Sequence, residues 1–290
     1  VGPFENYGEP VVQAALEAGV HYIDTTGEPA FVEMVKVKYG QAFLDAGLSL
    51  VPCTAYMYTP ADIGVQMLLE QGDMDSFEVV TAGTFVPTFA STQSIYSLFS
   101  HDARYLLHGK LEHWPSGRGY EVDVPGFACT QLIHPWAGGN LPLVYQDHPQ
   151  VHTLRQLSGN TNRELMEGVI GLQQQFDSEV RSLPQEERRG ALQKIVDQIE
   201  EFMPPRELTL IHKSCDIVVG TGSAGGRKWV MQSTSPYTQT GLYQAAAANK
   251  LIKQGPDKAG FTGPAQAFGH HYLLGQLKSF LPVKVTETDF

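Results

Sequence analysis

Residues 1–32 read VGPFENYGEPVVQAALEAGVHYIDTTGEPAFV, and the predicted fold depends on this stretch. A Gly-Pro turn signal comes first, and Pro10 then begins a helix, since a first-turn residue does not need its N–H. Gly19 follows as a residue that ends helices, and residues 21–25 (HYIDT) read as a short strand that ends in polar residues. Turn, helix and strand in this order predict half of a β-α-β unit.

The same residues resemble a segment of the saccharopine dehydrogenase-like family, which includes the trans-acting enoyl reductases. In that family the segment follows the fourth or fifth strand of the nucleotide-binding domain. Its pattern is a Gly-Pro-aromatic turn, Tyr-Gly-Glu/Asp-Pro, a helix and then Gly-x-x-Tyr-x-Asp-x-x-Gly-Glu. The resemblance therefore implies a Rossmann-type dinucleotide-binding domain at this end of the chain. The residues that match are Gly2, Pro3, Phe4, Tyr7, Gly8, Gly19, Tyr22, Asp24, Gly27 and Glu28.

Two further stretches resemble the same family. Residues 53–64 (CTAYMYTPADIG) keep its Cys, Pro, Asp and Gly, but residues 54–58 replace its Gly-Phe-Asp-Ser centre, which suggests a more apolar or aromatic pocket. Residues 237–265 resemble its Tyr and Thr-Gly before an Ala-rich helix and its Gly-aromatic-Thr-x-Pro-Ala loop. In the family the C-terminal segment returns to the first domain, and the resemblance implies the same return here.

The predicted fold class is α/β plus α+β. A partial Rossmann-type nucleotide-binding domain is followed by a substrate domain with a mixed or antiparallel sheet and long helices. Apolar stripes on the two long helices at 161–183 and 185–203 are expected to pack against that sheet. We place the C-terminal part of the nucleotide-binding domain at 1–52, a substrate and dimerisation domain at 53–255, and the returning segment at 256–290.

The cofactor loop of the family lies before the segment that residues 1–32 resemble, and no such loop precedes Val1. We expect the missing N-terminal nucleotide-binding segment to be cleaved off, disordered, part of a longer protein, on another chain, or lost. Residues 220–225 (GTGSAG) formally match Gly-x-Gly-x-x-Gly, but residues 227–234 after them read as a strand and not as a helix. This stretch therefore predicts a β-hairpin with a glycine-rich turn.

The composition argues against several classes of protein. A net charge of −11 and a pI of about 5.3 argue against a nucleic-acid partner. No apolar run reaches the length of a membrane span. Cys53, Cys129 and Cys215 are odd in number and far apart, so they form no disulfide framework and favour a reducing, cytoplasmic compartment.

No metal site is predicted from the 10 histidines, and a metal hydrolase ranks last among the functions considered. The histidines at 101–113 lie in a turn-rich segment without the spacing of a known metal motif. His270 and His271 are adjacent on a predicted helix, where neighbouring side chains point apart, so at most one of them is expected to serve a given site.

Two local motifs receive structural interpretations. Thr59–Asp62 (TPAD) predicts a capping box with Asp in place of Glu, ahead of an apolar helix. The loop that begins His134-Pro135-Trp136 fits either a pocket wall or a packed corner, and the sequence leaves both open.

The resemblance implies an NAD(P)-dependent oxidoreductase, with NADP or NAD as cofactor. Its substrate would be a small-molecule or carrier-bound apolar compound, reduced at an enoyl or imine group. A tyrosine donating a proton would need help from its surroundings, because its ordinary pKa lies near 10. The candidates are Gly2, Pro3, Phe4, Tyr7, Gly27 and Glu28 for the cofactor, Tyr58 and Tyr237 for catalysis, and Tyr56, Thr84 and Thr240 for the substrate.

The alternative is a non-catalytic binding or structural protein that kept the substrate domain and lost the cofactor half. The absent cofactor loop and the altered centre at residues 54–58 favour it, whereas the many matching residues before Glu28 oppose it. Homo-oligomers are a candidate assembly, and an exposed edge of an incomplete parallel sheet would need to be covered.

Overall fold

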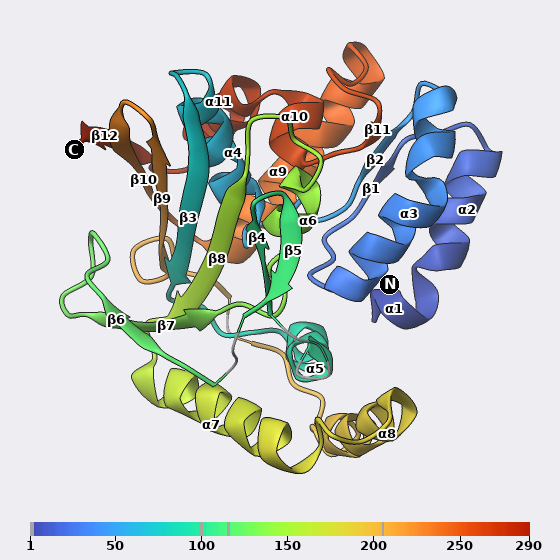
Figure 1. Ribbon diagram of the computed structural model, residues 1–290, viewed down its shortest axis with the longest axis vertical. Coiled ribbons are helices and arrows are strands. Elements are labelled where there is room, and N and C mark those ends of the chain that lie inside the picture. The colour runs from blue at the N-terminus through green and yellow to red at the C-terminus, as the bar shows by residue number, and fades with distance from the viewer. Residues whose placement is uncertain (1–2, 99–100, 102, 115–116, 205) are drawn as a thin grey trace.

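The chain folds around two sheets of different size, as a computed structural model shows (Figure 1). The structure describes residues 3–98, 101, 103–114, 117–204 and 206–290. The smaller sheet lies on one side of the molecule with the N-terminal helices, and the larger sheet crosses its centre. The predicted fold class, an α/β part of Rossmann type and a mixed sheet with long helices, is confirmed.

The smaller sheet is parallel throughout, with strand order β1-β2-β11. Helices α2 and α3 pack against each other beside it, and their apolar residues enclose Phe43 and Leu50 in a small core. Gly19 and Gly47 end the two helices with φ of +67°, a value that glycine adopts without a Cβ clash. The elements are α1 (Phe4–Tyr7), α2 (Glu9–Glu17), β1 (Tyr22–Ile23), α3 (Pro29–Asp45), β2 (Ser49–Val51) and β11 (Gly260–Phe261).

β11 comes from the far end of the chain. Its Gly260 and Phe261 pair with Ser49 and Leu50 of β2. The segment predicted to return to the first domain therefore supplies a strand to the smaller sheet, and its last strand, β12, joins the larger sheet instead. The predicted domain boundaries remain predictions.

The larger sheet has 9 strands in the order β12-β10-β9-β3-β8-β4-β5, with β7 also paired to β8 and β6 to β7. β3 and β8 are parallel, and the other pairs are antiparallel. The strands are β3 (Met74–Gly83), β4 (Arg104–Leu107), β5 (Lys110–His113), β6 (Tyr120–Val122), β7 (Gln131–Pro135), β8 (Thr153–Asn160), β9 (Lys213–Gly222), β10 (Gly225–Thr234) and β12 (Lys284–Asp289).

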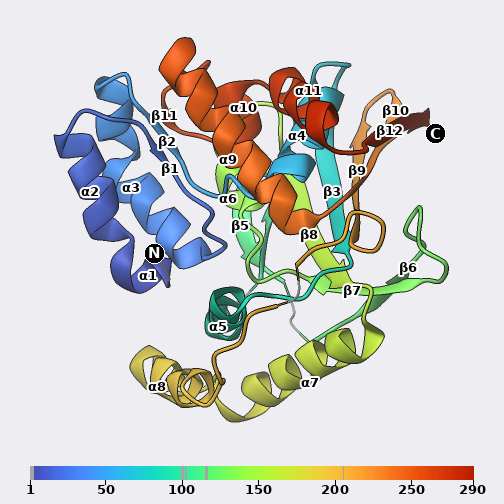
Figure 2. The ribbon, with the colours of Figure 1, turned by 180° about the vertical axis from the view of Figure 1, so that it is seen from behind.

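Helices cover one face of this sheet and one of its ends. α4 packs on β3, β9 and β10, and α11 packs on both α4 and α9, so these helices form a layer in front of the sheet in Figure 2. Trp229 and Tyr243 are among the largest side chains of the core they enclose. The helices are α4 (Thr59–Leu69), α5 (Phe89–Leu98), α6 (Leu141–Tyr145), α7 (Arg163–Glu179), α8 (Gln185–Val196), α9 (Pro236–Lys253), α10 (Pro264–Phe268) and α11 (His270–Phe280).

The glycine-rich stretch at 220–225 is a hairpin turn, as predicted. β9 and β10 pair in continuous register, and Gly225 opposes Gly222 across the turn. No helix follows, because residues 225–234 form β10. This stretch therefore lacks the helix N-terminus that a dinucleotide pyrophosphate needs.

The predicted capping box at Thr59–Asp62 is wrong. No side chain caps α4, and the buried Thr59 hydroxyl makes no hydrogen bond within the described part of the chain. Asp62 instead accepts hydrogen bonds from the Tyr145 hydroxyl (2.5 Å) and from the backbone N–H of Ala265 (2.7 Å). It thus holds the start of α10, a helix that lies far away in the sequence.

α7 packs on β7 and β8 of the larger sheet, as predicted. Met166, Ile170 and Phe176 are buried, whereas Leu165 and Leu172 remain 39% and 37% exposed and line a cavity. α8 packs mainly on α5, and it ends at Val196, before the predicted Met203. Among the described residues, no helix is both long enough and apolar enough to cross a membrane.

Candidate functional site

The candidate site is a cavity of about 790 Å³ between the N-terminal part of the chain and the larger sheet. Its walls include residues of the loops that follow β1, β2 and β3, within 25–28, 55–58 and 85–88, and the last three residues of β8, 158–160. Open α/β sheets bind ligands in the crevice outside the carboxyl ends of their strands. The cavity therefore occupies the place where this type of fold binds its ligands.

One wall of the cavity is formed by Phe4, Gly27 and Glu28. The carboxylate of Glu28 is buried and accepts hydrogen bonds from the N–H groups of Phe4 (3.1 Å) and Glu5 (2.8 Å). Ser94 of α5 also donates to it (3.2 Å). Glu28 thus occupies the N-terminus of α1, where N–H groups lack helical partners. Its observed role is to hold the Pro3–Phe4 turn against the cavity.

A second buried acid supports this wall from behind. Asp24 accepts hydrogen bonds from the N–H groups of Thr26 (2.9 Å) and Cys53 (3.1 Å) and from the hydroxyl of Tyr22 (2.8 Å). Burial raises the pKa of Asp24 to about 6 against these hydrogen bonds, which lower it. The carboxyl group ties the loop after β1 to the loop after β2, where Cys53 has a φ of +63°.

Tyr58, predicted as catalytic, lies beneath the Gly27 turn. The side chain is 4% exposed, and burial raises the pKa of its hydroxyl above the ordinary value. A Cβ placed on Gly27 would stand 2.3 Å from the Tyr58 hydroxyl oxygen. The tyrosine lines the cavity, and the close approach makes glycine necessary at position 27 unless Tyr58 moves.

Tyr56 and Thr240, predicted to bind substrate, both line the cavity. They are also hydrogen-bonded to each other. The Thr240 hydroxyl accepts the Tyr56 N–H (3.0 Å) and donates to the Pro236 carbonyl (3.2 Å). The Tyr56 hydroxyl donates to the Ala82 carbonyl (3.1 Å), and burial raises its pKa. These contacts join the loop after β2 to β3 and to the start of α9.

Tyr237, the other predicted catalytic residue, lines the cavity in a cluster of hydroxyl groups. Its hydroxyl accepts the N–H of Thr88 (2.9 Å) and donates to the Ser91 hydroxyl (3.0 Å). The Thr88 hydroxyl also accepts the Ser91 N–H (3.1 Å), so Thr88 caps the N-terminus of α5. Glu207 accepts the N–H groups of Tyr237 and Thr238, each at 3.1 Å, and so fixes the start of α9.

His134 and Trp136 are part of the cavity wall, which decides the question that the sequence left open. His134 lies opposite Ser158 in the β7–β8 ladder, is 3% exposed, and packs edge-on against Trp136 at 5.9 Å between ring centroids. Burial lowers the pKa of His134 to about 4, so the ring is neutral near pH 7. Its Nδ1 is buried and makes no hydrogen bond within the described part of the chain.

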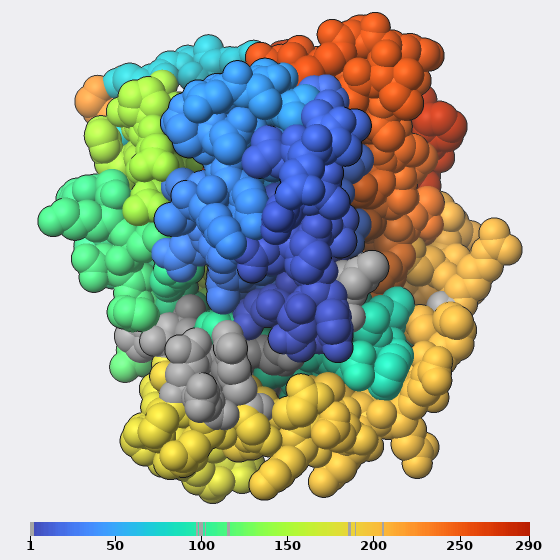
Figure 3. Space-filling model, turned by 90° about the vertical axis from the view of Figure 1, so that its right-hand side faces the viewer, coloured from blue at the N-terminus to red at the C-terminus, as the bar shows by residue number. Residues whose placement is uncertain are grey.

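The far wall of the cavity is apolar and helical. α5 contributes Ile95 and Leu98 to this wall, and α7 contributes Leu165, Val169 and Leu172. In Figure 3, α5 (teal) shows at the surface between the N-terminal segment (blue) and the α7–α8 pair (yellow). α5 thus forms a partition whose inner side faces the cavity.

Three candidate residues are placed elsewhere. Tyr7 is 56% exposed and does not line the cavity. The Thr84 hydroxyl accepts that of Thr161 (3.0 Å), and the residue lies behind the wall next to Phe85. Gly2 lies outside the described residues. Nothing in the sequence indicated a role for Glu207. The apolar positions of α7 were recognised, but the sequence did not indicate that some of them line a cavity.

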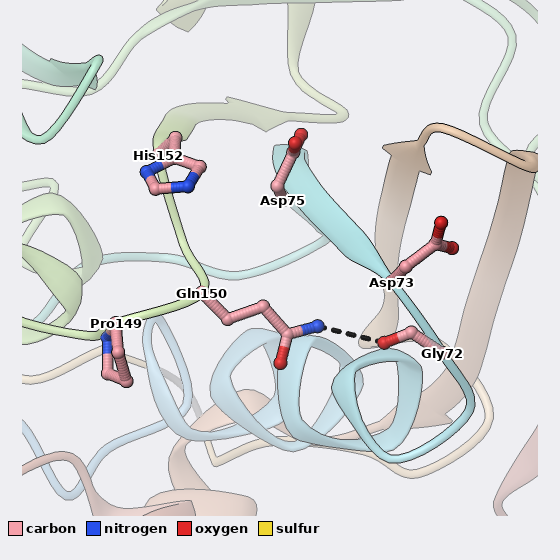
Figure 4. Close-up of a pocket in the computed structure, with 6 residues that line it drawn as sticks. All are labelled: Gly72, Asp73, Asp75, Pro149, Gln150 and His152. Atoms are coloured by element: carbon pink, nitrogen blue, oxygen red, sulfur yellow. Dashed lines mark hydrogen bonds between the residues drawn. The ribbon is translucent and has the colours of Figure 1, made fainter.

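A second depression, of about 590 Å³, lies at the start of β3 (Figure 4). Gln150 donates to the Gly72 carbonyl there (2.8 Å), while the side chains of Asp73, Asp75 and His152 point in different directions. Asp75 accepts from Ser76 (2.7 Å), and Asp73 pairs with Ser223. Because its polar groups do not converge, this depression has no feature of a binding site.

Comparisons with known proteins identify similarities at both the sequence and the fold level. The family model described as "Family of unknown function (DUF5938)" matches residues 59–286. A human protein named saccharopine dehydrogenase-like oxidoreductase is 42% identical over 65 residues, which cover 22% of this chain and 15% of the relative. A Mycobacterium tuberculosis protein whose name includes trans-acting enoyl reductase is 32% identical over 100 residues, which cover 34% of this chain and 23% of that protein. The resemblance to the saccharopine dehydrogenase-like family is thereby confirmed. The two matches span less than a quarter of either relative.

The solved structures show the same architecture. Apo saccharopine dehydrogenase (L-Glu forming) from Saccharomyces cerevisiae superposes with a TM-score of 0.57 over 99% of this chain and 84% of that chain. The sequences are 12% identical over this superposition, so the likeness is one of fold.

Proposed function

The chain belongs to the family of unknown function DUF5938, and we propose that it forms the substrate site of an NAD(P)-dependent oxidoreductase that reduces an apolar substrate. The single observation that carries the proposal is the position of the cavity. It lies at the carboxyl ends of β1, β2 and β3, between a polar wall on the N-terminal side and an apolar wall of helices. A nicotinamide would bind against the polar wall, and an apolar substrate chain would bind against the apolar wall.

The described residues fit one end of a dinucleotide. The turn at Pro3–Phe4 and the glycine at position 27 leave backbone close to the cavity, and Glu28 holds that turn in place. The glycine-rich stretch at 220–225 is a hairpin, so it supplies no pyrophosphate site. The reduced cofactor, NADPH or NADH, would supply the hydride. We propose that Phe4 and Gly27 face the nicotinamide side and that the pyrophosphate-binding loop belongs to a preceding segment or chain.

The remaining walls would bind and orient the substrate. Val169, Leu172 and Ile95 would enclose an apolar chain and exclude water from the reacting end. The neutral His134 ring, whose Nδ1 makes no hydrogen bond to any described residue, would form a hydrogen bond to a polar group of the substrate. The Tyr237 hydroxyl, which Thr88 and Ser91 hold in the cavity, is the proposed proton donor.

The experiment is a reduction assay with the natural full-length protein. NADPH or NADH is mixed with enoyl thioesters that carry short, medium or long apolar chains, and loss of nicotinamide absorbance is followed. We expect oxidation that rises with chain length and falls at least about 100-fold in Tyr237→Phe, the lower range for a general acid. Equal oxidation of all chain lengths, or none with any of them, contradicts the proposal.

A second candidate function is binding without catalysis. The Glu28 carboxylate and the Tyr56 and Thr240 hydroxyls all have structural partners, which a binding protein would also need. The two candidates differ in one result. A protein that binds an apolar fluorescent fatty acid but oxidises neither NADPH nor NADH is a binding protein.

A further inference from the structure

A cluster of metal-binding side chains lies at the far end of α4 from the cavity. Glu70 directly follows α4, and His270 and His271 are the first two residues of α11, which packs on α4. The cavity-lining residue next to α4 is Tyr58, which directly precedes Thr59 at the start of this helix. With a rise of 1.5 Å per residue, the 11 residues of α4 separate the two places by roughly 16 Å. The cluster is thus independent of the proposed substrate site.

Both histidines turn toward the same carboxylate. The Nε2 atom of His270 lies 2.9 Å from Oε1 of Glu70, and the Nε2 atom of His271 lies 3.0 Å from Oε2. The two rings stand side by side, with 4.3 Å between centroids and 40° between planes. The sequence predicted that adjacent helical side chains would point apart, and this prediction is wrong here. The two histidines begin the helix directly after Gly269, whose φ is +79°.

Only one of the two contacts has the geometry of a hydrogen bond, the one between Nε2 of His271 and Oε2 of Glu70 (3.0 Å). Nε2 of His270 is buried and makes no hydrogen bond of acceptable geometry with any described residue, although Glu70 is within 2.9 Å. The two rings thus present two ring nitrogens beside one carboxylate.

We propose that Glu70, His270 and His271 bind a divalent transition-metal ion of the Zn²⁺ type. One donor atom from each residue lies within 4.8 Å of the others, which is close enough to surround one ion after small side-chain rotations. Two imidazoles and a glutamate form a known zinc donor set, with bonds near 2.0–2.1 Å. Glu70 and His271 are 48% and 66% exposed, so water completes the coordination.

The ion would link two helices that no covalent bond connects nearby. It joins the C-terminus of α4, whose partial negative charge favours a cation, to the N-terminus of α11. Since the three residues come together only in the folded chain, binding would stabilise the folded state and raise its melting temperature.

The test is a titration of the metal-free chain with Zn²⁺ in competition with a coloured chelator, together with a melting curve. The variants are Glu70→Gln, His270→Asn and His271→Asn. The matched control is His108→Asn, because His108 is an exposed histidine outside the cluster whose φ of +49° asparagine also adopts. We expect one equivalent of Zn²⁺ to bind to the native chain and to the control.

Each of the three cluster variants should lose affinity at least about 10-fold, the lower end of the loss caused by removing a group outside the coordination shell. The rise in melting temperature should disappear with it. Equal affinity in all variants, or a loss in only one or two of the three, overturns the three-ligand site. Because the chelator titration involves no nicotinamide, its outcome is independent of the reductase assay.

Discussion

At the scale of single residues, buried carboxyl groups act mainly as structural connectors. Asp24, Glu28 and Asp62 each accept hydrogen bonds from backbone N–H groups of another segment. Asp216 differs, because Oδ1 accepts the Thr81 hydroxyl (3.0 Å) while Oδ2 is buried without a hydrogen bond in the described part of the chain. Its environment is therefore the least favourable for a negative charge.

Asp216 should make the stability of the protein depend on pH. Burial raises its folded-state pKa from 3.8 to about 8, so the folded state holds the proton more tightly than the unfolded state. The stability from this protonation is fully present below about 4 and is lost as the pH rises through about 8. The loss approaches about 1.4 kcal/mol per pH unit at most.

Urea unfolding of the native chain and of Asp216→Asn between about pH 6.5 and 8 measures this effect by difference, because Asp24, Asp62 and His134 are present in both chains. Asp216→Asn should flatten the decline in that interval, since asparagine stays neutral. A variant that keeps the full decline would show that another group titrates there.

Gly27→Ala should destabilise the protein by about 1–3 kcal/mol, as overpacking of a filled site does. The new Cβ would stand 2.3 Å from the Tyr58 hydroxyl oxygen. In a double-mutant cycle measured by urea unfolding, Tyr58→Phe should recover part of the loss. Gly171→Ala is the control, because its Cβ meets nothing within 4 Å and a helix interior gains about 0.5–1 kcal/mol from alanine. Equal effects of the two alanines would contradict the steric argument.

At the scale of elements, helix ends and helix faces form the cavity. The starts of α1, α5 and α9 are held by Glu28, Thr88 and Glu207, and each of these helices contributes residues to the wall. The inward face of α7 supplies the apolar wall. Local capping therefore positions the polar groups, and helix packing sets the width of the site.

Glu207→Ala should remove the hydrogen bonds to the N–H groups of Tyr237 and Thr238 at the start of α9. The expected cost is roughly 1 kcal/mol of unfolding free energy, the usual value for a lost N-terminal cap. Denaturant unfolding measures it. In the reductase assay the same variant should also lose rate, because Tyr237 is no longer fixed, and an unchanged rate would argue against Tyr237 as the proton donor.

Val169→Trp should fill the apolar part of the cavity. A fluorescent polyene fatty acid titrated into this variant should bind at least about 10-fold more weakly than to the native chain, a loss of about 1.4 kcal/mol. Val37→Trp on α3 is the matched control, because Val37 is 80% exposed and lies away from the cavity. Equal affinity of both variants would place the fatty acid elsewhere.

At the scale of the whole molecule, the chain end completes both sheets. β11 pairs with β2 of the smaller sheet, and β12 covers the edge of β10 in the larger one. Figure 1 shows β12 at the outer edge of the larger sheet, on the side opposite the N-terminal helices. The two parts of the fold are therefore joined by the last 31 residues, 260–290, as well as by the direct connection after β2.

Removal of residues 284–290 should expose the row of unpaired groups along β10 and promote self-association. Light scattering against protein concentration checks this. Thr288→Lys is the control, because residue 288 is exposed and keeps its backbone pairing with Lys228. A truncated chain that stays monodisperse at all concentrations would show that β10 needs no cover.

The sequence by itself determined the elements whose signals are local. Pro10 and Gly19 mark helix ends correctly, because proline and glycine restrict or permit backbone angles whatever surrounds them. The hairpin at 220–225 was predicted for the same reason. Residues 1–32 also carried the resemblance that placed the chain among the saccharopine dehydrogenase-like proteins.

Only the tertiary structure decided which residues meet. Asp62 reads as a cap for its own helix, yet it holds Ala265 instead. Leu165 and Leu172 fit a stripe that packs on a sheet, yet they face a cavity. Glu70 gives no signal in the sequence, yet it lies between two histidines from the other end of the chain. Contacts of this kind depend on how elements pack at long sequence separation, and neither backbone propensity nor periodicity encodes that arrangement.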